Sequence, residues 1–371
     1  MLYKLAVLFF AFVFMCGCNG QNPLDMLKDS KGGKNQERIR IGVSFPTKKE
    51  TRWINDYEYI RQAASDADVD LIAYIADKNA AEQEEQCDEI LKQGVSVLIL
   101  APHDARAAGN ITAKAKAAGV KVISYDRLVL GSDIDFYVSF DNVKVGELQA
   151  KYITKKAPSG KYIVFSGAPT DNNSKMFHSG AMNVLQPFVS SGKIKIIEDS
   201  PIDNWDADIA EKLTDKFIEK HGTEIAAIIA PNDKTAGGVI QALENHHIGG
   251  LVAVSGQDAD FEGARRVVAG LQSMTVFKNS QNLATAAIGA AMNMALGQPP
   301  PSNNVVYNGK GQIPSLLLEP LVADKENIIQ MLSQSGHITA EEASKLEKQE
   351  KIVFANIDDI VMMPALTGSS H

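Results

Sequence analysis

The chain has 371 residues, of which 45% are hydrophobic, 22% are charged and only 7% are aromatic. This balance is typical of a globular protein and excludes a disordered chain, a collagen-like repeat and a polytopic membrane protein. The length predicts two domains and leaves room for a third. With 37 basic and 45 acidic residues the formal charge is −8, which argues against a nucleic-acid partner, because phosphates attract clustered lysine and arginine.

The N-terminus has the pattern of an export signal. Residues 5–15 form an uninterrupted apolar run that is too short to span a bilayer but suits the core of a signal peptide. The run ends in Met15-Cys16-Gly17-Cys18, which resembles a bacterial lipobox. We therefore expect residues 1–17 to be a lipoprotein signal peptide and Cys18 to carry the lipid. Cys16 is a competing attachment site, and ordinary secretion with free cysteines is the alternative.

Residues 18–38 are mostly polar, with two adjacent glycines in the middle. We expect this segment to be a flexible tether between the anchor and a folded body on the outer side of the membrane. Cys87 is then the only thiol beyond the signal region, and its place in a helical pattern predicts an inert, packed side chain.

From residue 39 onward, short β-branched runs alternate with longer stretches rich in alanine and charge. The runs predict strands at 39–45, 69–75, 95–100, 120–124, 162–166, 194–198, 225–230, 251–255 and 274–277. The stretches predict helices at 50–66, 79–93, 104–118, 141–156, 173–190, 206–220, 234–245, 259–269 and 280–296. Strands that alternate with helices favour an α/β fold with parallel sheets, and at this length two sheets rather than one.

Polar or aromatic side chains follow most of these strands. In parallel sheets, ligands bind outside the carboxyl ends of the strands, so the pattern indicates a small polar ligand held between two lobes. Both tryptophans, Trp53 and Trp205, fall in such loops, where an indole face can stack on the C–H groups of a sugar ring. Packing at the hinge or within a lobe is the alternative for these two rings, and solvated loops or helix caps are the alternative for the polar residues.

Catalytic motifs are missing from the sequence. No G-x-G-x-x-G follows the first strand, and neither a P-loop nor a G-x-S-x-G elbow is present. Asp233, Asp258 and Asp260 could supply an acid–base pair for a glycosidase, and their spacing does not exclude this. We expect no enzyme activity, no catalytic residue, no metal site and no cofactor.

Several segments carry a family resemblance. They include Thr51-Arg52-Trp53, Tyr125-Asp126-Arg127, IDFYVSFDNVKVGELQAK at 134–151, Asp171 to Lys175, VSGQDAD at 254–260 and AGLQSMTVFK at 269–278. The chain resembles the type I periplasmic sugar-binding proteins of bacterial ABC importers from about residue 39 to 340, most of all their D-xylose-binding subgroup. The resemblance implies two Rossmann-like lobes with parallel sheets, joined by a three-crossing hinge that closes over the sugar.

The resemblance also implies boundaries and a site. The N-terminal lobe would comprise 39–143 and 279–309, the C-terminal lobe 144–278 and 310–332, and residues 333–371 would form an extension. The implied sugar contacts are Arg52, Trp53, Asp126, Arg127, Asp171, Asn173, Trp205, Asn232, Asp258 and Lys278. The two tryptophans would stack on the ring and the others would bind hydroxyls, although Asp126 and Asp171 could instead orient Arg127 and Asn173.

The implied function is capture of a monosaccharide, D-xylose first, and its delivery to an ABC permease with its ATPase by a monomeric protein in the cell envelope. A sensing role, with a membrane histidine kinase or a chemoreceptor as the partner, is the alternative. The opening Phe45-Pro46-Thr47-Lys48 equally resembles relatives that bind glucose, galactose or arabinose. In the extension, residues 344–351 predict a solvated helix, and no function follows from the rest.

Overall fold

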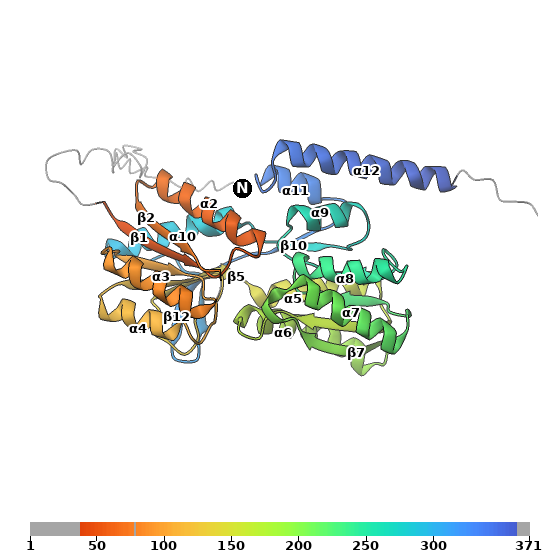
Figure 1. Ribbon diagram of the computed structural model, residues 1–371, viewed down its shortest axis with the longest axis horizontal. Coiled ribbons are helices and arrows are strands. Elements are labelled where there is room, and N and C mark those ends of the chain that lie inside the picture. The colour runs from red at the N-terminus through yellow and green to blue at the C-terminus, as the bar shows by residue number, and fades with distance from the viewer. Residues whose placement is uncertain (1–37, 78, 362–371) are drawn as a thin grey trace, which may run out of the picture. The chain divides into compact units, whose positions relative to one another are not determined.

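The computed structural model describes residues 38–77 and 79–361, and the side chains of residues 352–361 are outside that description. The expected signal peptide, the lipid site at Cys18, nearly all of the tether and the last ten residues of the extension lie outside the described residues. The described part forms two α/β lobes built on separate sheets (Figure 1). No described helix is both long and apolar enough to span a bilayer.

The N-terminal lobe is built on a seven-stranded sheet with the order β11-β12-β5-β4-β3-β1-β2. Its strands are β1 (Arg40–Phe45), β2 (Asp70–Ile75), β3 (Val97–Leu100), β4 (Lys121–Tyr125), β5 (Phe136–Phe140), β11 (Asn304–Tyr307) and β12 (Gln312–Leu318). All neighbours are parallel except β11 and β12, which form an antiparallel hairpin at one edge. Side chains of β3 alternate between two cores, so both faces of the sheet are buried.

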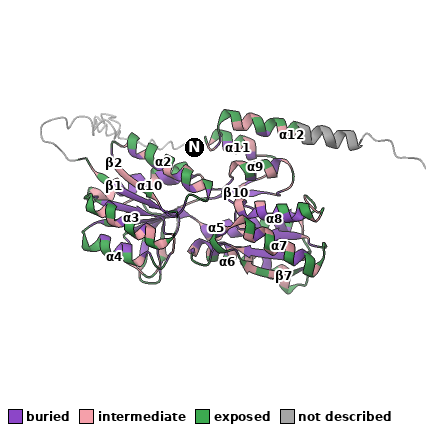
Figure 2. Ribbon diagram, in the orientation of Figure 1, coloured by how far each residue is buried: buried purple, intermediate pink, exposed green. Residues whose placement is uncertain are grey.

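Helices cover both faces of this sheet. Apolar residues of α2 (Thr51–Asp66) and α10 (Ser280–Ala295) pack with Val97 and Ile99 on one face. On the other face, α3 (Ala80–Lys92) and α4 (Gly109–Ala117) pack with Leu98 and Leu100. Figure 2 shows the result, with buried strands between helices that expose only their outer sides.

The C-terminal lobe has a four-stranded parallel sheet with the order β7-β6-β8-β9. Its strands are β6 (Gly160–Ser166), β7 (Ile194–Pro201), β8 (Ala227–Ile229) and β9 (Ala253–Val254), with β10 (Thr275–Phe277) and β13 (Leu321–Ala323) paired beside them. Its helices are α5 (Asn142–Lys156), α6 (Asn172–Ser190), α7 (Ala207–His221), α8 (Asp233–Asn245) and α9 (Phe261–Val268). α5 and α6 pack on one face of the sheet, and α7 and α8 on the other.

The chain passes between the sheets three times. It leaves the first sheet after β5, returns between β10 and α10, and leaves again between β12 and β13. The last crossing lies later than the expected boundary at 309/310, because β12 pairs with β5 of the N-terminal lobe. Residues 310–318 therefore belong to the N-terminal sheet, and the assignment of them to the C-terminal lobe is wrong.

All nine predicted strands and nine predicted helices are present, but β5, β11, β12 and β13 were not predicted. The extension is also more than a solvated helix. After α11 (Ile328–Gln334), helix α12 (Ala340–Val361) packs against α9 through Leu346, which is fully buried. The expectation of a wholly solvated helix at 344–351 is wrong, because one side of α12 completes a core of the C-terminal lobe.

Candidate functional site

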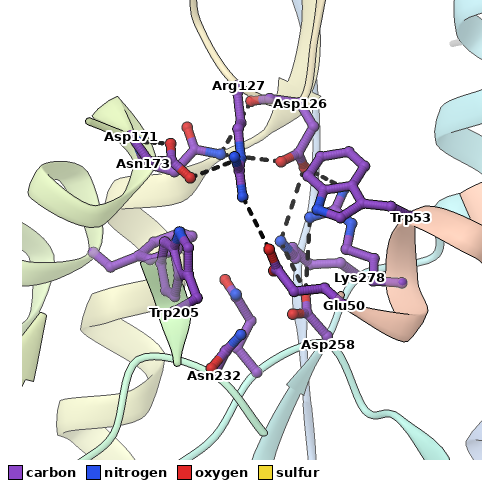
Figure 3. Close-up of a pocket in the computed structure, with 13 residues that line it drawn as sticks. Glu50, Trp53, Asp126, Arg127, Asp171, Asn173, Trp205, Asn232, Asp258 and Lys278 are labelled. Atoms are coloured by element: carbon purple, nitrogen blue, oxygen red, sulfur yellow. Dashed lines mark hydrogen bonds and ion pairs between the residues drawn. The ribbon is translucent and has the colours of Figure 1, made fainter. Parts of the chain in front are cut away.

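All ten residues that the sequence predicts as ligand contacts line one pocket, together with Glu50, Phe177 and Gln257 (Figure 3). The pocket draws residues from both lobes and from the crossing segment that holds Lys278. Nearly all of them sit just beyond the carboxyl end of a strand, as expected for a parallel α/β fold. The topology therefore brings together side chains that are up to 228 positions apart, from Glu50 to Lys278.

Helix N-termini fix two of the polar residues. Asp171 precedes α6, and its Oδ1 accepts the Asn173 backbone N–H at 2.9 Å. Asn232 precedes α8, and its Oδ1 accepts the backbone N–H of Thr235 at 3.0 Å. Capping in this way satisfies N–H groups that a helix leaves unpaired. Because the Oδ1 of Asn232 is used by the cap, its Nδ2 donor is the group left for a ligand.

The two tryptophans have different surroundings. Trp53 lies against both arginines, with the guanidinium carbons of Arg52 and Arg127 4.6 and 5.0 Å from the ring centroid. Such contacts are cation–π interactions. Trp205 packs edge-on against Phe177, with ring centroids 6.3 Å apart, and covers Gly167, where a Cβ would overlap the indole. Trp205 has no cation over its ring among the described residues.

The charged side chains of the pocket pair with one another. Arg52 Nη2 lies 2.5 Å from Asp126 Oδ2, and Lys278 Nζ lies 3.1 Å from Asp258 Oδ1. The Arg52 Nη1 also lies 3.8 Å from Asp258 Oδ1, so these four groups form one network. Burial of unpaired charges would be costly, and the pairing offsets that cost.

Arg127 belongs to a second network. Its Nε lies 2.8 Å from Asp171 Oδ2, and its Nη2 donates to Glu50 Oε1 at 3.3 Å. Asn173 joins the two networks. Its Nδ2 donates to Asp126 Oδ1 at 3.1 Å, and its backbone N–H donates to Asp171 Oδ1 at 2.9 Å. Asp171 thus holds Arg127, and Asp126 holds Arg52 and Asn173. The orienting role considered for the two aspartates is therefore present in the geometry, while both also line the pocket.

Burial and charge act in opposite directions on the carboxylates. Burial alone would raise the pKa of Asp126, but the charges of Arg52 and Lys278 outweigh it and hold the pKa below its usual value. For Asp171 and Glu50, burial is the larger effect, and it raises the pKa of each despite the nearby Arg127. Asp126 is thus held in its charged form more firmly than Asp171 or Glu50.

Some buried polar atoms at the pocket have no hydrogen-bond partner among the described residues. They include Arg52 Nε, Gln257 Oε1 and the indole N–H groups of Trp53 and Trp205. A hydroxyl both donates and accepts, so it can satisfy either kind of atom. These unpaired donor and acceptor atoms suit a ligand that is rich in hydroxyl groups. Within the described part of the chain, no group of three metal-binding side chains is present.

Sequence reasoning missed three lining residues. Glu50 lies two positions before Arg52, directly before α2, and Gln257 directly precedes Asp258. Phe177 follows Asn173 by four residues on α6, so both lie on the same side of the helix. The first two were visible as polar residues at strand ends, but Phe177 gave no signal that separates it from a core residue.

Comparison with known proteins decides the family. The model of the periplasmic binding protein domain matches residues 41–299, about 70% of the chain. The chain belongs to the periplasmic binding protein family. This periplasmic binding protein is 39% identical over 300 residues to the D-xylose-binding periplasmic protein of Escherichia coli, covering 81% of the chain and 91% of the relative.

Two other similar proteins have names that point beyond xylose, one to several sugars and one to glucose. The multiple sugar-binding periplasmic receptor of Rhizobium radiobacter is 31% identical to this chain over 323 residues. The match covers 81% of this chain and 91% of the receptor. An ABC transporter solute-binding protein of Clostridium phytofermentans with bound β-D-glucose has a TM-score of 0.77 and 31% identity, over 82% of this chain and 99% of its own.

These matches confirm the type I fold and the resemblance described above. The family consists of periplasmic solute receptors rather than enzymes, and the names of the relatives above assign sugar binding and ABC transport to those relatives. The family match gives no support to the hypothesis that Asp233, Asp258 and Asp260 supply an acid–base pair for a glycosidase.

Proposed function

We propose that this protein captures one monosaccharide, D-xylose in the first place, in the pocket between its lobes and delivers it to an ABC permease. The observation that carries the proposal is the set of thirteen lining residues, which combines paired charges, amides and an indole face. Charged and amide groups suit hydroxyls, and the indole suits the C–H face of the ring. The empty space of the pocket, with its open mouth included, is about 240 Å³.

In this proposal each predicted residue has a role. Trp205 supplies the stacking face, and Trp53 lines the pocket while it supports the two arginines. Arg52, Arg127 and Lys278 donate to hydroxyls, and Asp258 and Asp126 accept from them. Asn173 and Asn232 donate through their amide N–H groups. Asp171 keeps Arg127 in place at 2.8 Å and contributes its remaining acceptor capacity.

The identity to D-xylose-binding relatives favours xylose, and the glucose-bound neighbours make glucose the first competitor. A thermal-shift panel of the chain from residue 19 with xylose, ribose, arabinose, glucose and galactose tests the proposal. A ligand that binds only the native state adds about 2.7 kcal/mol of stability at 100 times its Kd. Xylose should give the largest rise in Tm. A panel in which no sugar raises the Tm would exclude the proposed function.

We further propose that Cys18 anchors the protein to the membrane and that it acts as a monomer. Mass spectrometry of the membrane fraction should find lipid on Cys18, and Cys18→Ser should release the protein from that fraction. Pull-down from membranes with and without xylose separates the partners: recovery of a permease supports transport, whereas recovery of a histidine kinase supports sensing.

A further inference from the structure

Asp233 has a fully buried carboxylate. It adjoins Asn232, which lines the sugar pocket, but it does not line the pocket itself. It is the first residue of α8, next to Asn232. Its Oδ1 accepts from Gln272 Nε2 at 2.7 Å, and its Oδ2 accepts from Thr275 Oγ1 at 3.0 Å and from the Asp260 backbone N–H at 3.1 Å. A buried carboxylate with three donors is costly to remove, since each donor would lose its partner.

These bonds join three segments, each of which carries a pocket residue. α8 begins beside Asn232, the loop at residues 256–260 carries Gln257 and Asp258, and β10 ends one residue before Lys278. The backbone N–H of Asp233 also donates to the Gln257 carbonyl at 2.9 Å. Thr275 extends the connection, because its Oγ1 accepts the Ala259 N–H at 3.2 Å.

The loop at residues 256–260 needs such support. Asp258 and Ala259 have φ values of 92° and 54°, a region that L-residues other than glycine seldom adopt. Conformations of this kind persist only where the surrounding structure fixes them. The loop lies tightly against the carboxylate of Asp233, because a Cβ at Gly256 would overlap that group, and the first turn of α9 does the same at Gly263.

We propose that Asp233, acting with Thr275, is a positioning residue that holds the strained loop so that Asp258 faces the bound sugar. This inference rests on the proposed sugar-binding function. Asp233 touches no pocket space itself, so its effect on affinity passes through Gln257, Asp258 and the end of β10.

The test compares four variants of the full chain by calorimetry with D-xylose. Asp233→Ala removes the carboxylate directly. Thr275→Val keeps the shape but removes the hydroxyl between Asp233 and Ala259, whereas Thr275→Ser keeps that hydroxyl. Thr214→Val is the matched control, because Thr214 is equally buried in the same lobe and its hydroxyl donates only to Ala210 within α7. Amide hydrogen exchange of residues 257–260, without sugar, is measured on each variant.

We expect Thr275→Val to weaken xylose binding about tenfold or more, the effect of losing one buried hydrogen-bonded link. Thr275→Ser should bind xylose with a Kd within about threefold of the wild-type Kd. Thr214→Val should have the wild-type affinity for xylose, even if its Tm is lower. Exchange at residues 257–260 should speed up in Thr275→Val and Asp233→Ala but not in Thr214→Val.

Equal affinity and equal exchange in Thr275→Val and the wild type would overturn the inference. A wild type that binds no sugar would instead overturn the proposed function, and the exchange data would still show whether Asp233 and Thr275 order the loop. If Asp233→Ala does not fold, the comparison of Thr275→Val with Thr275→Ser decides the question.

Discussion

Several pocket residues stabilise the fold and line the pocket at the same time. Asp171 and Asn232 cap α6 and α8, and the remaining atoms of the same side chains face the pocket. Arg52 packs on Trp53 and pairs with Asp126. Such residues are already held in place before a ligand arrives, which lowers the entropy lost on binding.

Of the pocket side chains, Asp258 should contribute most directly to the affinity for the sugar. It pairs with Lys278 at 3.1 Å and is the pocket carboxylate on the strained loop. Asp258→Asn should weaken xylose binding about 100-fold, in keeping with the roughly 2–5 kcal/mol lost when one partner of a buried charge pair is removed. Calorimetry measures the change.

The matched control for Asp258 is Asp199→Asn, a half-exposed carboxylate in the same lobe that pairs with His178 outside the pocket. Its affinity for xylose should equal that of the wild type. If Asp258→Asn bound xylose as tightly as this control, Asp258 would have no part in the site.

Glu50 gives a pH dependence with a defined sign. Because burial raises its native pKa above the unfolded value, the native state binds more protons between the two values. The contribution of Glu50 to the free energy of unfolding is therefore largest below about pH 4.3. It falls as the pH rises through the native pKa of Glu50. Relative to Glu50→Gln, the wild type should lose stability in urea titrations from about pH 4 to 7. A relative gain over that range would mean that Arg127 lowers the pKa instead.

Cys87 should be unreactive in the native protein. Burial raises the pKa of its thiol to about 12, and the thiolate is the reactive form. In the chain from residue 19, which lacks the other two cysteines, a thiol reagent at pH 8 should label Cys87 only in denaturant. Rapid labelling of the native protein would show that this part of α3 opens.

At the scale of elements, the period of the apolar residues predicted the central strands and the helices between them. It failed where a strand lacks that signal. β5 lies within the IDFYVSF stretch, which carries the family resemblance, and it follows β4 with no helix between the two strands, so it breaks the alternation of strands and helices. β11 is short and largely exposed, β13 has only three residues, and β12 contains a proline, so none of them has the sequence pattern of a buried strand.

Helix α12 is the element whose packing the sequence did not reveal. Leu346 is fully buried against residues of α9, together with Ile338. Leu346→Ala should lower the free energy of unfolding by about 2–5 kcal/mol, as other buried Leu→Ala changes do. Lys348→Ala, on the exposed side of the same helix, should change it by less than about 0.5 kcal/mol. Urea unfolding followed by circular dichroism measures both, and equal values would show that α12 does not pack on the lobe.

Across the two lobes together, the ten predicted contacts could be chosen because each follows a strand and, except for Trp205, lies in a segment that carries the family resemblance. Their convergence could not be read from spacing, since it depends on three crossings between two sheets. The last crossing was misplaced for the same reason: the pairing of β12 with β5 joins segments about 180 residues apart. Contacts between lobes, such as Ala105 N–H to the Thr170 carbonyl at 3.0 Å, are equally invisible in the sequence.

We expect this two-lobed protein to bind one monosaccharide in the pocket that Trp205 and Asp258 line. Isothermal titration of the chain from residue 19 with D-xylose tests it most directly. We predict a single site with one sugar per chain, and loss of the signal in Trp205→Ala while circular dichroism shows both lobes still folded. Absence of heat with xylose and with glucose, or unchanged binding in Trp205→Ala, would contradict the claim.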